Sequence, residues 1–114
     1  MPTTNRYCLA LDLENDPEAI QAYDDHHRAV WPDIEQSLLD SGIRVMEIYR
    51  TGNRLFMIME TTEDFSFEKK AELDRKNPDV QRWETLMNRY QKRLPGTKPG
   101  EKWQLMKRIY RFEA

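Results

Sequence analysis

The chain has 114 residues, of which 39% are hydrophobic and 33% charged, a composition that suits one folded domain over residues 1–114. Its 18 lysines and arginines and 20 aspartates and glutamates are interspersed and leave a net charge of −2, which excludes a basic nucleic-acid-binding surface. No apolar run is long enough to cross a bilayer, so no membrane association is expected. The first residues do not resemble a signal peptide and Cys8 is the single cysteine, so we expect a cytoplasmic protein without disulfides.

The amino-terminal third of the sequence predicts one strand followed by a divided helix. Apolar side chains alternate with small or polar ones over residues 7–13, which is typical of a strand. Asp16 is the expected N-cap and Pro17 the first residue of a helix. Because Pro32 disfavours a continuing helix, we expect this helix to end near Arg28 and another to begin at Pro32, with an ordinary kink as the alternative. The inward stripe of both consists of Ile20, Tyr23, His27, Val30 or Trp31, Ile34 and Leu38.

A hairpin and two further helical segments follow. Gly42 suits the position that ends a helix, and residues 43–49 and 54–61 predict two strands joined by a tight turn. A short helix is expected within 65–74, and an asparagine and a proline introduce a longer helix expected over 78–92. The inward stripe of the longer helix consists of Val80, Trp83, Met87, Tyr90 and Leu94.

A final strand expected over residues 103–112 completes the order β-α-β-β-α-β, with the second helical segment divided. This order predicts a ferredoxin-like α+β protomer in which helices cover one face of a four-stranded antiparallel sheet. The other face of the sheet also carries large residues and would present an extensive apolar patch to water. We therefore expect two such sheets to pair in a homodimer.

His27 is the candidate catalytic residue. It follows Tyr23 by four positions, so both side chains share one helix face and lie one turn apart. His27 falls near the centre of the apolar stripe, where a leucine would pack better, whereas His26 lies about 90° off the stripe. The break at Pro32 would open a mouth beside His27. The alternative is a core histidine whose nitrogens are satisfied by backbone carbonyls or by a tyrosine.

An imidazole, a phenol and indole rings together suit a carbohydrate, because aromatic faces pack on sugar C–H groups while polar groups bind hydroxyls. Trp31 and Trp83 supply the indoles, although Trp83 could equally be a core residue. A histidine near its ordinary pKa can accept and donate a proton, as reactions at an anomeric centre require. The sequence contains no metal-ligand spacing and no glycine-rich phosphate loop, so neither a metal nor a cofactor is expected. Cys8, inside an apolar strand, is interpreted as packing rather than as a nucleophile.

Four segments resemble the L-rhamnose mutarotase family in the same order along the chain: YDDHHRAVWPDIEQSL, GIRVMEIY, RLFMIMET and VQRWETLM. The resemblance covers roughly residues 5 to 112, and its most specific parts are Y-x3-H-x3-WP and QRW. It implies a dimeric α+β barrel of ferredoxin-like protomers that interconverts the α and β anomers of a free deoxy sugar without a cofactor. It also implies that His27 transfers protons and that Tyr23 and Trp83 contact the substrate.

Two positions depart from the rhamnose-specific pattern. Glu84 stands where those members have a second tryptophan, and Met46 stands where they have a substrate-contacting tyrosine. A lost phenol and a lost indole would change which hydroxyl epimers are recognised. Together with the forms GIRxMEIY, QRWExLM and PGEKWxLM, these changes favour the branch of the family associated with L-fucose, with L-rhamnose as the alternative substrate.

Several alternatives stay open at this level. The partner of His27 in proton transfer could be Tyr23, a water molecule or Glu84. Trp103 could line the pocket or the dimer interface. A monooxygenase with the same dimeric barrel is one competing class, although a tyrosine–histidine pair is not what such an oxidation demands. A sugar-binding regulatory module is another, in which His27 would only hydrogen-bond a hydroxyl.

Overall fold

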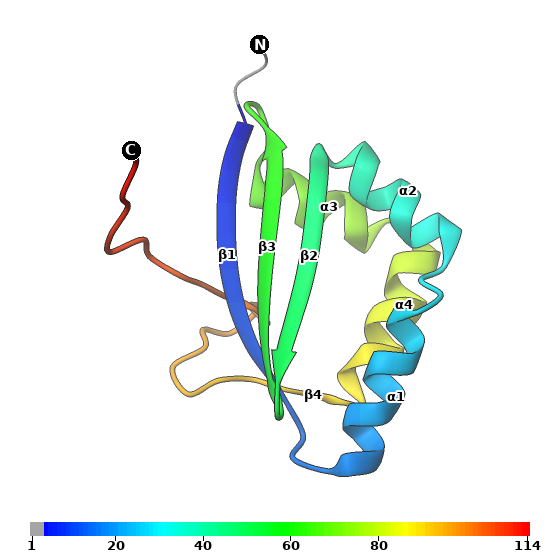
Figure 1. The fold of residues 1–114 in the computed structure, drawn as a ribbon. Helices are drawn as coiled ribbons and strands as arrows, with labels where there is room; N and C mark the ends of the chain where they lie inside the picture. The colour runs from blue at the N-terminus through cyan, green and yellow to red at the C-terminus, as the bar shows by residue number, and fades with distance from the viewer. Residues whose placement is uncertain (1–3) are drawn as a thin grey trace.

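The structure is a computed structural model that describes residues 4–114. Its elements in chain order are β1 (Thr4–Leu13), α1 (Pro17–His27), α2 (Pro32–Asp40), β2 (Ile43–Thr51), β3 (Arg54–Thr62), α3 (Phe67–Arg75), α4 (Pro78–Asn88), β4 (Gln91–Lys92) and β5 (Gln104–Leu105). The sheet has the order β2-β3-β1-β4, and β5 pairs with β1 beside β4. All its pairings are antiparallel. Figure 1 shows the helices gathered on one side of the sheet.

The predicted ferredoxin-like arrangement is confirmed, because the strand order and the single helical layer are those of this fold. Side chains point alternately to the two faces of the sheet along each strand, and most of those on the helix-facing side are buried. Leu9 lies opposite Met57 and Leu11 opposite Leu55 in the register, and all four are core residues. The core therefore fills the space between the sheet and the helices, and it continues around Tyr23.

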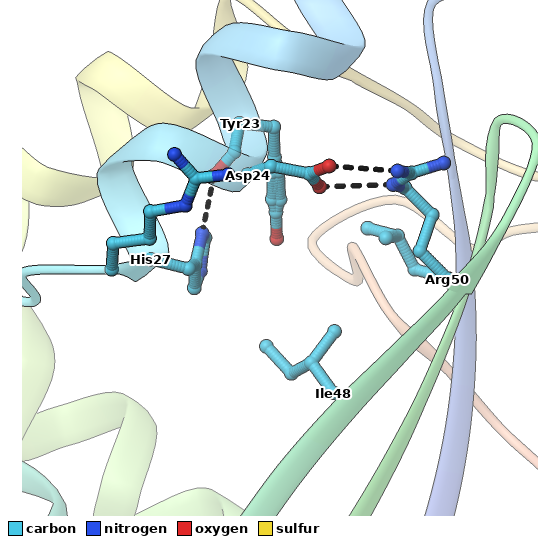
Figure 2. A pocket seen from close by; sticks show the side chains of 7 residues that line it. Tyr23, Asp24, His27, Ile48 and Arg50 are labelled. Carbon is cyan, nitrogen blue, oxygen red and sulfur yellow. Dashed lines mark hydrogen bonds and ion pairs between the residues drawn. The ribbon is translucent and has the colours of Figure 1, made fainter.

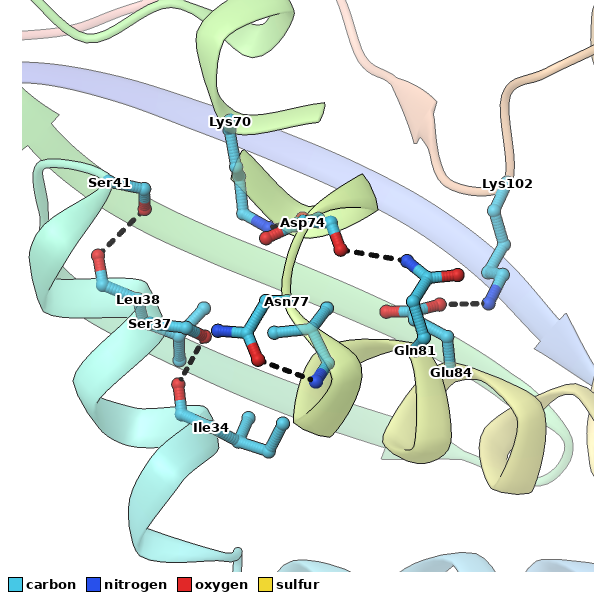
Figure 3. Close-up of polar contacts among 11 residues, drawn as sticks. Ile34, Ser37, Leu38, Ser41, Lys70, Asp74, Asn77, Gln81, Glu84 and Lys102 are labelled. Atoms are coloured by element: carbon cyan, nitrogen blue, oxygen red, sulfur yellow. Dashed lines mark hydrogen bonds and ion pairs between the residues drawn. The ribbon is translucent and has the colours of Figure 1, made fainter. Parts of the chain in front are cut away.

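The predicted helix over residues 78–92 was too long by four residues. Asn77, labelled in Figure 3, caps α4 as expected, since its side chain accepts hydrogen bonds from the backbone of Asp79 and Val80. The helix ends at Asn88, and Gln91 and Lys92 pair with the end of β1. Backbone pairing with an open strand edge outweighs the apolar spacing that would have continued the helix.

The predicted strand over residues 103–112 was also too long, because only Gln104 and Leu105 pair with β1, followed by one hydrogen bond from Met106 N to Cys8 O (2.7 Å). The chain then leaves the sheet, as Figure 1 shows. Ile109, Tyr110 and Phe112 are 92%, 77% and 76% exposed, so this apolar segment has little packing against the rest of the chain.

Within the described residues 4–114, the sheet face away from the helices carries apolar side chains without a covering layer. The register places Tyr49 opposite Phe56, and it places Ile58 between Glu47 and Cys8. Val45, on the same face by alternation, is 41% exposed, and Tyr49 is 54% exposed. We call this surface the open face. Among residues 4–114, no helix has the length and apolarity needed to cross a membrane.

Candidate active site

The predicted break between two helices is confirmed and sets the position of His27. Asp16 caps α1 by accepting a hydrogen bond from Ala19 N, and α1 ends at His27. Trp31 has extended backbone angles (φ −59°, ψ 134°), as a residue before proline prefers, and α2 begins at Pro32. The chain therefore turns away directly after His27, which leaves this side chain on the last turn of α1.

The hydrogen bond of His27 fixes its tautomer. Its Nδ1 lies 2.8 Å from the carbonyl oxygen of Tyr23, which can only accept, so Nδ1 carries the hydrogen. Burial lowers the pKa of His27 below the ordinary 6.5, against the opposite effects of the Tyr23 carbonyl and the Asp24 carboxylate. The imidazole is therefore neutral near pH 7, and its Nε2 carries a lone pair that can accept a proton.

A cavity of about 310 Å³ lies beside this imidazole, which is large enough for a small molecule. Its lining consists of Tyr23, Asp24, His27, Arg28, Ile48, Arg50 and Leu55. Figure 2 shows the side chains of α1 facing those of β2 across this space. Apolar side chains from the sheet and polar ones from both sides thus meet around one cavity.

Tyr23 adds an acidic group next to the imidazole. The two rings lie edge to face with their centroids 4.4 Å apart, and Tyr23 is 3% exposed. Burial raises the pKa of Tyr23 to about 12, and the nearby Glu84 carboxylate acts in the same direction. The hydroxyl accepts a hydrogen bond from Gln91 Nε2 at 3.3 Å. The phenol therefore keeps its proton at neutral pH and has it available to donate.

Of the two predicted tryptophans, Trp83 packs against the imidazole and Trp31 packs against Trp83. Trp83 stands edge to face with His27 at 5.6 Å and with Trp31 at 5.1 Å between ring centroids. Trp83 is 8% exposed and belongs to the core cluster, and neither indole lines the cavity. The structure thus brings Tyr23, His27, Trp83 and Trp31 into one aromatic row, with the histidine and tyrosine at the cavity.

Glu84 and Met46 occupy different surroundings. Glu84 of α4 forms an ion pair with Lys102, which Figure 3 shows, and its charge acts on Tyr23. Met46 packs against the second core cluster, which contains Leu9, Ile43, Met57, Met59 and Phe65, and it does not line the cavity. Trp103 contacts both core clusters. Glu84 and Met46, the two residues that differ from the rhamnose-specific pattern, therefore do not line the cavity of one protomer.

Sequence reasoning missed three charged residues of the cavity: Asp24, Arg28 and Arg50. Arg50 binds Asp24 through two hydrogen bonds of 2.9 and 2.7 Å and holds the pKa of that carboxyl below its usual value. Alternation along β2 was the available signal, since Arg50 shares the helix-facing side of the strand with Met46 and Ile48.

Among residues 4–114, no group of three or more histidine, cysteine, aspartate or glutamate side chains could hold a metal ion.

The fold and the cavity together define a small ferredoxin-like α+β protein whose cavity is lined by a neutral histidine and a protonated tyrosine. A family model described as L-rhamnose mutarotase matches residues 6–112, and the chain belongs to this family. A Xanthomonas campestris pv. campestris protein named L-fucose mutarotase is 46% identical over 107 residues, which cover 92% of this chain and 86% of that protein. A Dictyostelium discoideum protein named UPF0734 protein is 36% identical over 111 residues, 91% of this chain and 86% of that protein.

Solved structures share the fold at low sequence identity. The crystal structure of an L-rhamnose mutarotase from Formosa agariphila has a TM-score of 0.69 at 22% identity, covering 96% of this chain and 99% of that one. Tetracenomycin F2 cyclase from Streptomyces glaucescens, a type-II polyketide cyclase, has a TM-score of 0.60 at 18% identity, covering 96% and 98%. These similarities support the fold assignment, while the family assignment comes from the sequence comparisons.

Proposed function

We propose that this protein is a mutarotase that interconverts the α and β anomers of a free 6-deoxy-L-hexose, with L-fucose as the preferred sugar and L-rhamnose as the alternative. The family and the 46% identical relative named L-fucose mutarotase support this substrate class. The observation that carries the proposal is the neutral His27, whose Nε2 is available beside the cavity and next to a protonated phenol.

The reaction needs one proton removed and one supplied. His27 Nε2 takes the proton of the anomeric hydroxyl as the bond between C1 and the ring oxygen breaks, which leaves an open-chain aldehyde. Tyr23 is our candidate for the group that protonates the ring oxygen, because its hydroxyl proton is free to donate. Rotation about the bond between C1 and C2 and the reverse proton transfers close the ring as the other anomer. No metal or cofactor is required by these steps.

The remaining predicted contacts belong to this proposal. Trp83 packs against the imidazole and Trp31 packs against Trp83, and we retain both as candidate substrate-binding residues, for which the aromatic row is the supporting observation. Glu84 is retained because its charge acts on Tyr23. Met46 is retained on the family resemblance alone.

The proposal also includes a homodimer in the cytoplasm. The open face and the exposed apolar segment after β5 are the features that a second copy of the chain would cover. The single Cys8 is unpaired, which suits a reducing compartment.

Anomeric exchange followed by saturation-transfer NMR on L-fucose and L-rhamnose tests the function. We expect His27→Ala to lower the catalysed exchange rate by about 10²- to 10⁴-fold, the usual contribution of a positioned base, with the fold unchanged by circular dichroism. His26→Ala is the matched control, because its ring is bound to the Tyr90 hydroxyl (3.3 Å) and does not line the cavity.

Three results would contradict parts of this proposal. A His27→Ala variant with the wild-type rate would remove the histidine from the mechanism. Faster exchange on L-rhamnose than on L-fucose would keep the reaction and reverse the preference. Binding of either sugar without accelerated exchange would identify a sugar-binding module instead of an enzyme.

A further inference from the structure

A charged pair joins α1 and β2 at the wall of the cavity. Arg50 reaches from β2 to Asp24 of α1, with Nε 2.9 Å from Oδ1 and Nη2 2.7 Å from Oδ2 (Figure 2). Its Nη1 also donates to the carbonyl oxygen of Gly52 at 2.8 Å. Both side chains line the same cavity as His27. The pair is therefore oriented from two elements before any ligand arrives.

The pair keeps hydrogen-bonding capacity that its own contacts do not use. A guanidinium has five N–H donors, and the three bonds just described leave two of them. A carboxylate can accept about four hydrogen bonds, and Arg50 occupies two of those sites on Asp24. The side chains are 32% and 36% exposed, so a molecule in the cavity can reach the remaining donors and acceptors.

Hydroxyl groups fit this combination because each one can accept from an N–H and donate to a carboxylate. The neighbouring wall is apolar, formed by Ile48 and Leu55, and it suits the C–H groups and the methyl group of a deoxy sugar. A fixed guanidinium–carboxylate pair presents its donors and acceptors at set positions, so it can distinguish hydroxyl configurations. L-Fucose and L-rhamnose differ in configuration at C2 and C4.

We propose that Asp24 and Arg50 bind ring hydroxyls of the sugar and select its configuration. This role rests on the proposed mutarotase function and deepens it, because it places the specificity determinants in the same cavity as the proton-transfer residues, Asp24 beside them on α1 and Arg50 facing them from β2. Asp24 and Arg50 line the cavity and can contact a sugar there, whereas Met46 does not line it.

A purely structural tie between α1 and β2 is the competing explanation, and the two make different predictions. A structural tie would affect every sugar by the same factor, since it would act only through the shape of the cavity. A hydroxyl contact would affect only sugars that carry the hydroxyl concerned. Partly exposed ion pairs contribute little to folding stability, so the variants should fold.

The test compares Arg50→Leu and Asp24→Asn with the full-length wild type. The substrates are L-fucose and its 2-, 3- and 4-deoxy analogues. Polarimetry follows the reaction at about pH 8, where His27 is neutral. We expect Arg50→Leu to lower kcat/KM on L-fucose by about 10- to 100-fold, the cost of a lost hydrogen bond to a charged group. On the analogue that lacks the contacted hydroxyl, the kcat/KM values of wild type and variant should agree within about threefold. The hydrogen bond is then already absent in the wild type, so removing Arg50 costs nothing more.

Lys70→Met is the matched control. Lys70 pairs with Asp74 within α3 at 2.5 Å. Their side chains are 23% and 22% exposed, respectively, and neither residue lines the cavity. This variant should keep the wild-type kcat/KM on every sugar.

The outcomes separate the two proposals. An equal loss on L-fucose and on all three analogues would identify a structural tie and overturn the role of the pair in selection. An Arg50→Leu variant with the wild-type kcat/KM would overturn it as well. If the wild type accelerated neither L-fucose nor L-rhamnose, the mutarotase function itself would fail, and the role of Asp24 and Arg50 would fail with it.

Discussion

At the scale of single residues, the proposed mechanism makes activity depend on the protonation of His27. Burial lowers the pKa of His27 below 6.5, and the proposed mechanism uses the neutral imidazole. We therefore expect kcat/KM for L-fucose to stay level at neutral pH and to fall only as the pH drops through this lowered pKa. NMR titration of the His27 ring proton should give the same midpoint. An acidic limb centred at or above pH 6.5 would contradict this assignment.

The same pKa has a consequence for stability. Between the folded pKa and 6.5, the unfolded chain binds more protons at His27 than the folded chain does. Stability from this residue is therefore complete above pH 6.5 and is lost as the pH falls towards the folded pKa. Urea unfolding should show this decline in the wild type, and a smaller decline in His27→Ala.

The sequence predicted that Tyr23 and His27 meet at the site, but it did not predict their hydrogen bonds or the charged residues beside them. Helical spacing was enough to put Tyr23 and His27 on one face, because a helix repeats every 3.6 residues. The tautomer of His27 depends on a 2.8 Å contact with a backbone carbonyl, and the pairing of Arg50 with Asp24 depends on how β2 packs beside α1. Such contacts between elements follow from tertiary packing, which local periodicity does not describe.

At the scale of elements, local signals located the starts of three helices correctly and the ends of two elements incorrectly. Asp16, Pro32 and Asn77 each begin a helix where expected, since caps and prolines act through neighbouring backbone groups. The ends of α4 and of the last strand were misplaced because both depend on which part of the β1 edge is available for pairing.

Gly42, which joins α2 to β2, illustrates a local requirement that can be tested. Its φ is +99°, and an added Cβ would lie 2.8 Å from Thr62 Oγ1, which is itself hydrogen-bonded to Asp64. Gly42→Ala should lower the free energy of unfolding by about 2 to 4 kcal/mol, from backbone strain, the close contact and a disturbed hydrogen bond.

Gly52→Ala is the matched comparison for this substitution. Gly52 also has a positive φ (+55°), but nothing lies within 4 Å of its added Cβ. Only backbone strain then opposes the alanine, at about 1 to 2 kcal/mol. Urea unfolding measures both variants, and equal losses would show that the contact with Thr62 has no effect.

At the scale of the whole molecule, the exposed apolar side chains of the open face lead us to expect that a second copy of the chain covers it. One protomer exposes Val45 and Tyr49 on the sheet and Ile109, Tyr110 and Phe112 after it, a large apolar surface for a chain of this size. A second copy would bring the same surface, so face-to-face pairing about a two-fold axis would cover both. We expect sedimentation equilibrium at micromolar concentration to give twice the mass of one chain.

Ile58 lies at the centre of the open face, because β3 is flanked by β1 and β2 and Ile58 pairs with Cys8 and Glu47. Ile58→Glu would place two buried carboxylates across the interface of a dimer, so we expect this variant to sediment as a monomer. Leu73→Glu is the control, since Leu73 is a 50% exposed apolar residue on α3, on the helical side of the sheet, and should leave the dimer intact. A wild-type monomer, or a dimer that survives Ile58→Glu, would show that the open face is not where two chains meet.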